Sequence, residues 1–422
     1  PCLEHPANEG ETYAPLVRSG ILAAVLSVAK LTAEQASYYE DSVAESREDY
    51  YAGRGEARGV AMGRAAAAAG LSGELADGEL AELLALRRPR RGEGEPAELR
   101  RLGSARRVLA TEVDPATGAL VSTTKTLAPV SGYDMTFGVP KSLSVLAETA
   151  DPETAEGRHI ISSVNEAHEA AVAAALSYLE DHTCRVRLGR GGALSAPGSG
   201  FVAAAYRHRT SRAQDPHLHT HVLVANATQG PDGRWRALDG QAILGGRAGQ
   251  TGDHRHAASD LYDATLRAEM AARGFRFGAL RRGGFGEIAE VPEAVVREFS
   301  TRRRQVVEEM AATGQAGYHG SRAAALMTRA RKVAGALDLP AARRAWRARA
   351  EEHGLSATQI EDVGARALLR LEFGQEIPAP SPEAVIDELV SARGLTETAN
   401  TFNEARARQA ICQAHQQGIT PE

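Results

Sequence analysis

Three histidines, His208, His219 and His221, have the residue type and spacing of a metal-ligand set. They lie in the stretch YRHRTSRAQDPHLHTHVLVAN, residues 206–226, which is predicted to form two strands joined by a turn over residues 211–216. Alternate residues of a strand share a face, so His219 and His221 project together, and the turn places His208 opposite His219. Three neutral imidazoles can bind one divalent ion and leave coordination positions open, which suits Lewis-acid chemistry on an anionic oxygen.

A fourth histidine, His217, has the same strand parity as His219 and could also be a ligand. It follows Pro216 at the edge of the loop, so we interpret it as a bystander. The alternative interpretation of the whole set is a histidine-rich strand on a solvated face. The chain has 13 histidines, and a third histidine in hairpin register favours the ligand set.

Two tyrosine pairs, Tyr38-Tyr39 and Tyr50-Tyr51, lie upstream, each beside an acidic residue. The first pair falls on a helix predicted to begin at Thr32, where the sequence TAEQ forms a capping box. Paired tyrosines on helices usually contribute to packing. A phenol has a pKa of about 10, so a tyrosine that acts as a nucleophile needs a base or a metal-polarised target.

The third candidate group is the carboxylate of Asp134, in the segment SGYDMTFGVPKS. Asp134 and Thr136 share one face of a predicted strand, and a turn then leads to Ser142 as a helix cap. A carboxylate beside a ligand imidazole fixes its tautomer and raises its basicity.

The predicted elements define an α+β fold, in which an antiparallel sheet is flanked by helices and followed by a mostly helical C-terminal region. Strands are expected at 21–30, within 118–148, at 184–192 and in the histidine hairpin; helices are expected at 55–110, 142–180, 258–274 and 292–310, and from about 320 onward. The expected organisation is a loose N-terminal extension over 1–25, a catalytic domain over 26–320 and a helical region over 321–422.

Composition and charge indicate a soluble protein that is neither a polycation nor a membrane-spanning protein. The chain has 422 residues, of which 43% are hydrophobic and 24% charged, as in ordinary soluble proteins. Its net charge of −5 means that any contact with nucleic acid depends on local arginine clusters. The apolar run at 21–29 is too short to span a bilayer, so no membrane insertion is expected.

Three cysteines, Cys2, Cys184 and Cys412, are far apart in the sequence. They form neither a disulfide framework nor a metal-binding spacing, which fits the reducing cytoplasm. The sequence contains no G-x-x-x-x-G-K-[ST] motif and so no ATP-driven motor. Because the first residue is proline, we expect a fragment or a processed product.

These segments together resemble the relaxase domain of conjugative relaxases of the MobF (TrwC/TraI-like) family, within the HUH endonucleases. The resemblance rests on the tyrosine region Leu26–Tyr51, the aspartate motif Gly132–Leu146 and the H-x10-H-x-H histidine motif, in that order. LYDATLRAEM and EIAEVPEAVVREFSTRR resemble the segments that follow, so the likeness covers about residues 26–310. Residues 401–418 look like the approach to a helicase region, of which 321–422 would be the truncated start.

The resemblance implies a two-layer, palm-like sheet and an enzyme that nicks one DNA strand at an origin of transfer. Tyr38 would be the leading nucleophile and Tyr50 the candidate for a second step, with Tyr39 and Tyr51 as lesser candidates. Asp134 would orient a ligand histidine or take the tyrosine proton. The implied cofactor is Mg²⁺ or Mn²⁺, with Zn²⁺ or another divalent ion left open.

The implied partners are single-stranded DNA at the origin of transfer and the accessory DNA-binding and coupling proteins of a conjugation system. The protein would act as a monomer in the cytoplasm. Other HUH enzymes, such as rolling-circle initiators and transposases, are an alternative, although here the tyrosines precede the histidines. Two further alternatives are a mononuclear three-histidine oxygenase or hydrolase that does not act on DNA, and a DNA-binding module with a structural metal.

Overall fold

The structure, a computed structural model, describes most of the chain from residue 130 onward and separate segments before it. The described residues are 26–31, 59–76, 79, 84, 106–113, 120–127, 130–245, 252–280, 286–314, 316–328, 338–374, 380–391, 395 and 402–419. The predicted helix that begins at Thr32 lies outside the described residues, as do both tyrosine pairs.

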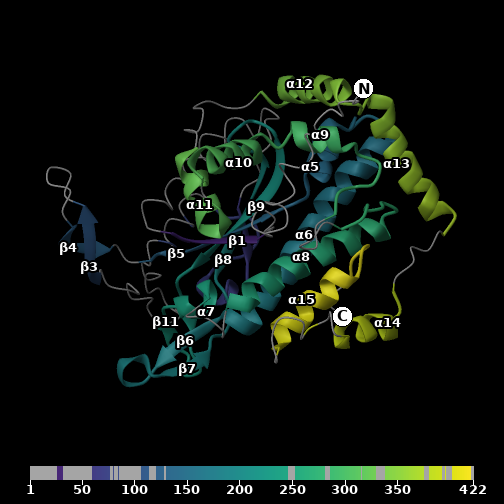
Figure 1. The fold of residues 1–422 in the computed structure, drawn as a ribbon. Coiled ribbons are helices and arrows are strands. Elements are labelled where there is room, and N and C mark those ends of the chain that lie inside the picture. Colours follow the sequence, from purple (N-terminus) through teal and green to yellow (C-terminus); the bar gives the residue numbers. More distant parts are fainter. Residues whose placement is uncertain are drawn as a thin grey trace.

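A five-stranded antiparallel sheet forms the centre of the molecule, with the strand order β1-β5-β9-β8-β2. Figure 1 labels four of its strands, β1, β5, β8 and β9. Its strands are β1 (Leu26–Leu31), β2 (Val60–Met62), β5 (Gly132–Gly138), β8 (Ala203–Thr210) and β9 (Pro216–Ala225). The pattern of β9 explains its central place, because buried residues alternate with the histidines up to His221 and all later residues are buried.

Two long helices, α6 (Ala155–Thr183) and α8 (Gly252–Ala272), pack on one face of the sheet and against each other (Figure 1). The sheet contributes Phe137, Val222 and Val224 to this core, all fully buried. Helix α6 begins at Thr154, whose side-chain oxygen accepts a hydrogen bond from the backbone N–H of Gly157 at 3.0 Å. The predicted fold class, an antiparallel sheet flanked by helices, is confirmed.

The opposite face of the sheet carries a second, smaller core that covers only part of it. Tyr206 and Leu223 from the sheet pack there with Leu71 and Leu75 from the segment 59–76. The histidines lie farther along the same face, beyond this small core.

The helix predicted over 55–110 is wrong for residues 59–76 and 106–110, although the described residues 79 and 84 are helical. Residues 59–76 form β2 and a single 3-10 turn, η1 (Ala67–Ala69), and residues 106–113 form strand β3, which pairs with β4 (Leu120–Leu127). Gly63 and Gly70 have φ angles of 90° and 84°, which end regular helix on either side of η1. Local alanine content favoured a helix, but contacts with the sheet determine the observed path.

The helix after β5 begins one residue earlier than predicted, and Ser142 does not cap it. Helix α5 (Lys141–Thr149) has Pro140 at its N-cap. Ser142 lies inside the helix, fully buried, and its hydroxyl oxygen accepts a hydrogen bond from the backbone N–H of Ile288 at 2.9 Å. A tertiary contact thus replaces the predicted local one.

Helix was also predicted continuously over 292–310, but the structure has two helices there, α9 (Glu293–Glu298) and α10 (Thr301–Thr313). The remaining short elements are β6 (Arg185–Leu188), η2 (Arg190–Gly192), β7 (Leu194–Pro197), β10 (Thr228–Gln229), β11 (Trp235–Arg236) and α7 (Gly240–Leu244). The C-terminal helices are α11 (Gly317–Met327), α12 (Leu339–Glu352), α13 (Ala357–Glu372), α14 (Pro382–Val390) and α15 (Glu404–Ala414).

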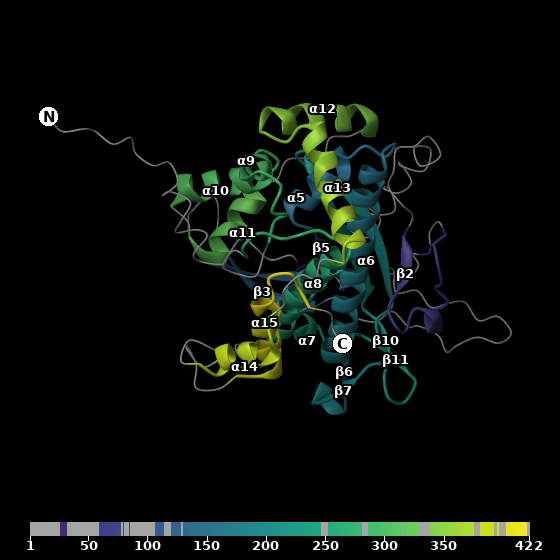
Figure 2. The same cartoon turned by 90° about the vertical axis from the view of Figure 1, so that its right-hand side faces the viewer.

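The described C-terminal residues are mainly helical, as predicted, and several of these helices pack on the main core. Figure 2 shows α13 running alongside α6, while α12 crosses the end of the molecule beyond α5. Trp346 of α12 and Ile360 of α13 are buried in the same core as the sheet. None of the helices in the described ranges has the length and apolar character that crossing a membrane requires.

Candidate metal centre and active site

The three predicted ligands lie on neighbouring strands and on one face of the sheet. His208 of β8 pairs directly with His219 of β9, as the sequence predicted, and His221 lies diagonally across from His208. Their ring centroids are separated by 5.4 Å for His208–His219, 5.2 Å for His208–His221 and 5.1 Å for His219–His221. The structure therefore brings the three histidines together.

Asp134 determines which nitrogen of His221 faces the other histidines. It lies on β5, which pairs with β9, and its side chain is buried. His221 Nδ1 lies 2.8 Å from Asp134 Oδ1 and 3.0 Å from Oδ2. Since a carboxylate accepts, Nδ1 carries the hydrogen and Nε2 keeps its lone pair for a metal ion.

Thr136 holds the carboxylate of Asp134 in place. The two residues share a strand face, as predicted, and the Thr136 hydroxyl donates to Asp134 Oδ1 at 3.1 Å. The same hydroxyl lies 3.1 Å from His221 Nδ1, the atom that Asp134 binds. Of the two roles considered for Asp134, this geometry favours orienting a histidine.

A backbone carbonyl binds Nδ1 of His219, as Asp134 binds Nδ1 of His221. The Nδ1 atom of His219 lies 2.8 Å from the carbonyl oxygen of His217, so Nδ1–H donates and Nε2 again keeps its lone pair. Burial lowers the pKa of His219 well below its ordinary value, and the neighbouring histidines His217, His208 and His221 lower it further. The ring is therefore neutral at physiological pH, which is the form that binds metals.

The separations of the three rings fit a shared divalent ion, but their orientations are not yet those of a closed site. Imidazoles at about 2.0–2.1 Å from a tetrahedral ion have centroids about 5 Å apart, as observed here. The rings of His208 and His219 are only 25° from parallel. Within the described part of the chain, no three His, Cys, Asp or Glu side chains already form a set that could hold an ion. Coordination of an ion therefore requires the imidazole rings to rotate.

His217, interpreted as a bystander, stacks on His219 with ring centroids 4.6 Å apart. Its Nδ1 atom is buried without a hydrogen-bond partner among the described residues. Burial, with a smaller contribution from Lys141, lowers the pKa of His217 to about 3. The stacking and the carbonyl contact give His217 a supporting position beside a ligand.

A polar connection beneath the sheet escaped the sequence analysis. His168 of α6 lies 2.7 Å from the Thr220 hydroxyl through Nε2, and 2.6 Å from the Tyr262 hydroxyl of α8 through Nδ1. Thr220 separates His219 from His221 along β9 and faces the opposite side of the sheet. A buried histidine between two hydroxyls anchors the centre of β9 to both long helices. The one signal in the sequence for this connection is a histidine, His168, on the buried face of a predicted helix.

The nucleophile candidates Tyr38, Tyr39, Tyr50 and Tyr51 lie outside the described residues. The strand that precedes them, β1, pairs with β5 next to the site, with Ala29 opposite Asp134. The chain therefore leaves the sheet from the strand that neighbours Asp134.

Comparison with known proteins identifies the same family that the sequence motifs resemble, along most of the chain. The family model of the TrwC relaxase matches residues 32–353. The multifunctional conjugation protein TraI of Escherichia coli is 30% identical over 256 residues, which cover 60% of this chain. That stretch is only 13% of the length of TraI, so the chain spans a small part of that relative.

Solved structures of a TrwC conjugative relaxase have a similar fold. A copper-bound complex with OriT DNA is 28% identical, with a TM-score of 0.58, over 78% of this chain and 98% of the other. A complex with a 27-mer DNA comprising the recognition hairpin and the cleavage site is also 28% identical, with a TM-score of 0.57 and the same coverage.

The antiparallel sheet and its histidine hairpin define the class of HUH endonucleases. The family match extends over more than half of the chain and includes strands β2, β5, β8 and β9 with the histidine motif. This chain belongs to the TrwC relaxase family.

Proposed function

We propose that this protein is a site- and strand-specific DNA relaxase of conjugative transfer. It would nick single-stranded DNA at an origin of transfer and join the 5′ end of the cut strand to a tyrosine. The observation that carries the proposal is the three-histidine face with Asp134 on His221 Nδ1. Relatives in the same family have been solved with OriT DNA and with bound metal, which supports both the substrate and the cofactor.

His208, His219 and His221 would hold the metal, the last two through Nε2. A bound divalent ion would polarise the non-bridging oxygens of the scissile phosphate. Asp134 would keep His221 in the ligating tautomer, and the His217 carbonyl would do the same for His219. We propose Mg²⁺ or Mn²⁺ as the physiological ion on the family resemblance. Zn²⁺ or another divalent transition metal is the alternative, since imidazole ligands suit such ions.

The nucleophile in this proposal is Tyr38, with Tyr50 for a second step and Tyr39 and Tyr51 as lesser candidates. The phenolic oxygen forms a bond to phosphorus while the bond to the 3′ oxygen breaks. The phenol loses its proton, and the departing 3′ oxygen takes one up to become a hydroxyl. One phosphodiester replaces another, so the step reverses without ATP.

The remaining parts of the proposal concern partners and setting. The DNA strand would lie over the histidine face, held by arginine–phosphate contacts and base stacking. Accessory DNA-binding proteins and a coupling protein would assist, and the protein would act as a cytoplasmic monomer. The catalytic domain predicted over 26–320 contains all the proposed catalytic and ligand residues.

The polarity of the cut strand tests this proposal. Purified protein and Mn²⁺ are incubated with single-stranded oligonucleotides tiling the DNA around its gene. The products are then treated with polymerase on an annealed complementary template, or with a 5′ exonuclease. A relaxase leaves a 3′-hydroxyl that polymerase extends and a protein-blocked 5′ end that resists the exonuclease. Products with free 5′ phosphates would indicate ordinary hydrolysis and contradict the proposal.

A further inference from the structure

The turn of the histidine hairpin has an unfavourable backbone conformation. Gln214 has a φ angle of 59° and is the only residue other than glycine with a positive φ among those described. Such a conformation is disfavoured for residues with a Cβ atom. Ser211 closes the turn by donating its N–H to the Asp215 carbonyl oxygen at 2.9 Å, and its hydroxyl accepts from the Asp215 N–H at 3.2 Å. A strained turn of this kind persists only where surrounding contacts hold it.

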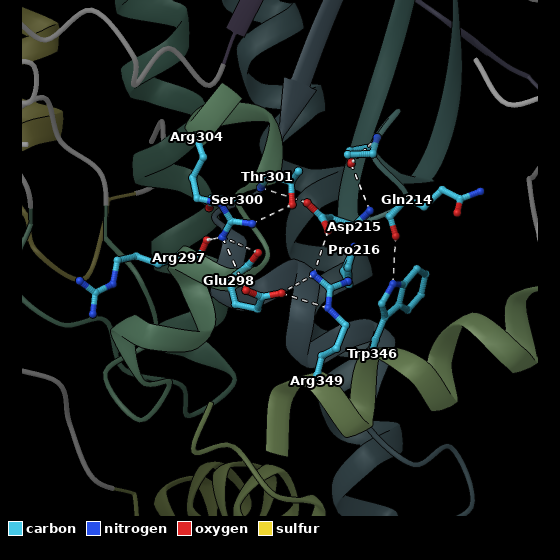
Figure 3. A network of polar contacts seen from close by, with 12 residues as sticks. Gln214, Asp215, Pro216, Arg297, Glu298, Ser300, Thr301, Arg304, Trp346 and Arg349 are labelled. Carbon is cyan, nitrogen blue, oxygen red and sulfur yellow. Dashed lines mark hydrogen bonds and ion pairs between the residues drawn. The ribbon is translucent and has the colours of Figure 1, made fainter. Parts of the chain in front are cut away.

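Helix α12 supplies one of these contacts from more than a hundred residues away. The indole Nε1–H of Trp346 donates to the carbonyl oxygen of Gln214 at 3.0 Å (Figure 3). Trp346 is 3% exposed, so the hydrogen bond is shielded from competing water. The helix begins at Asp338, whose side chain accepts from the N–H of Ala341.

The carboxylate of Asp215 is held by α10 and again by α12. It is 2% exposed, and Oδ2 accepts from the backbone N–H of Thr301, the first residue of α10, at 3.1 Å. Oδ1 lies 3.4 Å from Nη2 of Arg349 on α12. Arg349 also binds Glu298 of α9 at 2.7 Å, and this hydrogen bond lowers the pKa of Glu298. Figure 3 shows the three helices converging on the turn through these side chains.

A third connection from α12 reaches the hairpin beside His208 through Glu148 of α5. The pairing of β8 and β9 shifts register after His208, and Arg209 is the next residue of β8. Arg209 binds Glu148 at 2.8 Å, and Arg343 of α12 binds the other oxygen of the same carboxylate at 3.1 Å. Glu148 is fully buried, so the two arginines neutralise a charge that water cannot reach.

From these contacts we infer that α12 is a positioning element of the metal centre, with Arg349 and Trp346 as its principal positioning residues. Strand β8 runs from His208 into this turn, and β9 runs from the turn to His219, so the conformation of the turn determines how the two side chains meet across the hairpin. The inference rests on the proposed function, because it takes these histidines as ligands. It extends the functional unit past residue 320, where the sequence placed the end of the catalytic domain.

Helix α12 also offers a matched control. Arg347 donates to the carbonyl oxygens of Thr149 at 2.7 Å and Ala150 at 2.9 Å, at the end of α5 and away from the hairpin. Arg347→Gln therefore removes a comparable pair of hydrogen bonds from the same helix without touching the turn. Trp346→Phe is the mildest test variant, since it keeps an aromatic ring and removes the Nε1–H donor.

The test measures Mn²⁺ binding by the full chain, by electron paramagnetic resonance of the free ion, together with the urea midpoint of each variant. We expect Arg349→Gln and Trp346→Phe to raise the Mn²⁺ dissociation constant about tenfold, the lower end of the range for residues that support metal ligands. Arg347→Gln should leave it within about twofold. Hydrogen exchange of the peptide 206–221 should speed up in the first two variants and stay unchanged in the third.

Equal dissociation constants for all three variants would overturn the inference, and so would a wild-type chain that binds no Mn²⁺. Neither measurement uses DNA, so the result is independent of the nicking assay. If the predicted affinities are found but no DNA is nicked, the proposed function fails and the positioning role stands. If DNA is nicked and the Mn²⁺ affinities of the variants do not change, the proposed function stands and the positioning role of α12 fails.

Discussion

His221 Nδ1 lies 2.8 Å from Asp134 Oδ1 across two paired strands, and this contact fixes which nitrogen of His221 points toward His208 and His219. The carboxylate is buried, so the hydrogen bond is strong and the ring cannot flip without losing it. It is the most direct link between the sheet and the proposed chemistry.

Asp134→Asn should slow DNA cleavage while leaving single-stranded DNA binding unchanged. An amide oxygen still accepts the Nδ1–H of His221 but lacks the charge that raises its basicity, so metal affinity should fall about tenfold. Single-turnover cleavage and fluorescence anisotropy with the same oligonucleotide separate the two effects. If binding falls in step with cleavage, Asp134 has a structural role instead.

Each of the substitutions His208→Ala, His219→Ala and His221→Ala should lower metal affinity by about a hundredfold or more, because each removes one of three ligands. His217→Ala should be much milder, since that ring stacks on a ligand and does not complete the set. Isothermal titration of the metal-stripped protein with Mn²⁺ measures this directly. Chelation of the wild-type protein should abolish nicking, and added Mn²⁺ should restore it. A loss at His217 as large as at the other three would make it a fourth ligand.

The buried His168 should make stability sensitive to acid. Burial lowers its pKa in the folded protein to about 3, whereas an unfolded chain binds a proton near pH 6.5. The unfolded state therefore binds more protons between these values, and stability is lost as pH falls below about 6.5. Between pH 6.5 and pH 5 this contribution amounts to about 2 kcal/mol.

His168→Gln tests this contribution, because glutamine does not titrate. Urea unfolding of both proteins at pH 7.5 and pH 5 gives the pH dependence of their difference. The variant should be less stable at pH 7.5, through its altered contacts with Thr220 and Tyr262, but should lose about 2 kcal/mol less than wild type on acidification. Asp260 and Asp263, whose pKa values burial raises to about 7, contribute equally to both proteins. Parallel losses in the two proteins would contradict the account.

The sequence predicted the parts of the site that depend on short-range periodicity. The two-residue period of strands placed His219 and His221 on one face, and the length of the turn placed His208 opposite His219. The same period put Asp134 with Thr136, although only the pairing of β5 with β9 identified His221 as their partner.

Contacts between distant segments could not be predicted in this way. Trp346 and Arg349 reach the turn at Gln214 and Asp215 from more than 130 residues away, and neither has a local pattern that differs from an ordinary helix. The segment 59–76 has helix-forming alanines, yet the sheet beneath it and its glycines determine its structure. Tertiary packing overrode local propensity there.

The identity of the adducted tyrosine tests the central claim most directly. Wild type, Tyr38→Phe and Tyr39→Phe are incubated with Mn²⁺ and a single strand that contains the nick site, separated under denaturing conditions, digested and analysed by mass spectrometry. Since removing the phenolic oxygen removes the nucleophile and keeps the ring, Tyr38→Phe should bind DNA and form no adduct. Tyr39→Phe should form the adduct, and the wild-type peptide should carry it on Tyr38. An adduct on Tyr50 or Tyr51 with Tyr38→Phe fully active would contradict the assignment of the nucleophile, and the absence of any adduct in wild type would contradict the relaxase mechanism itself.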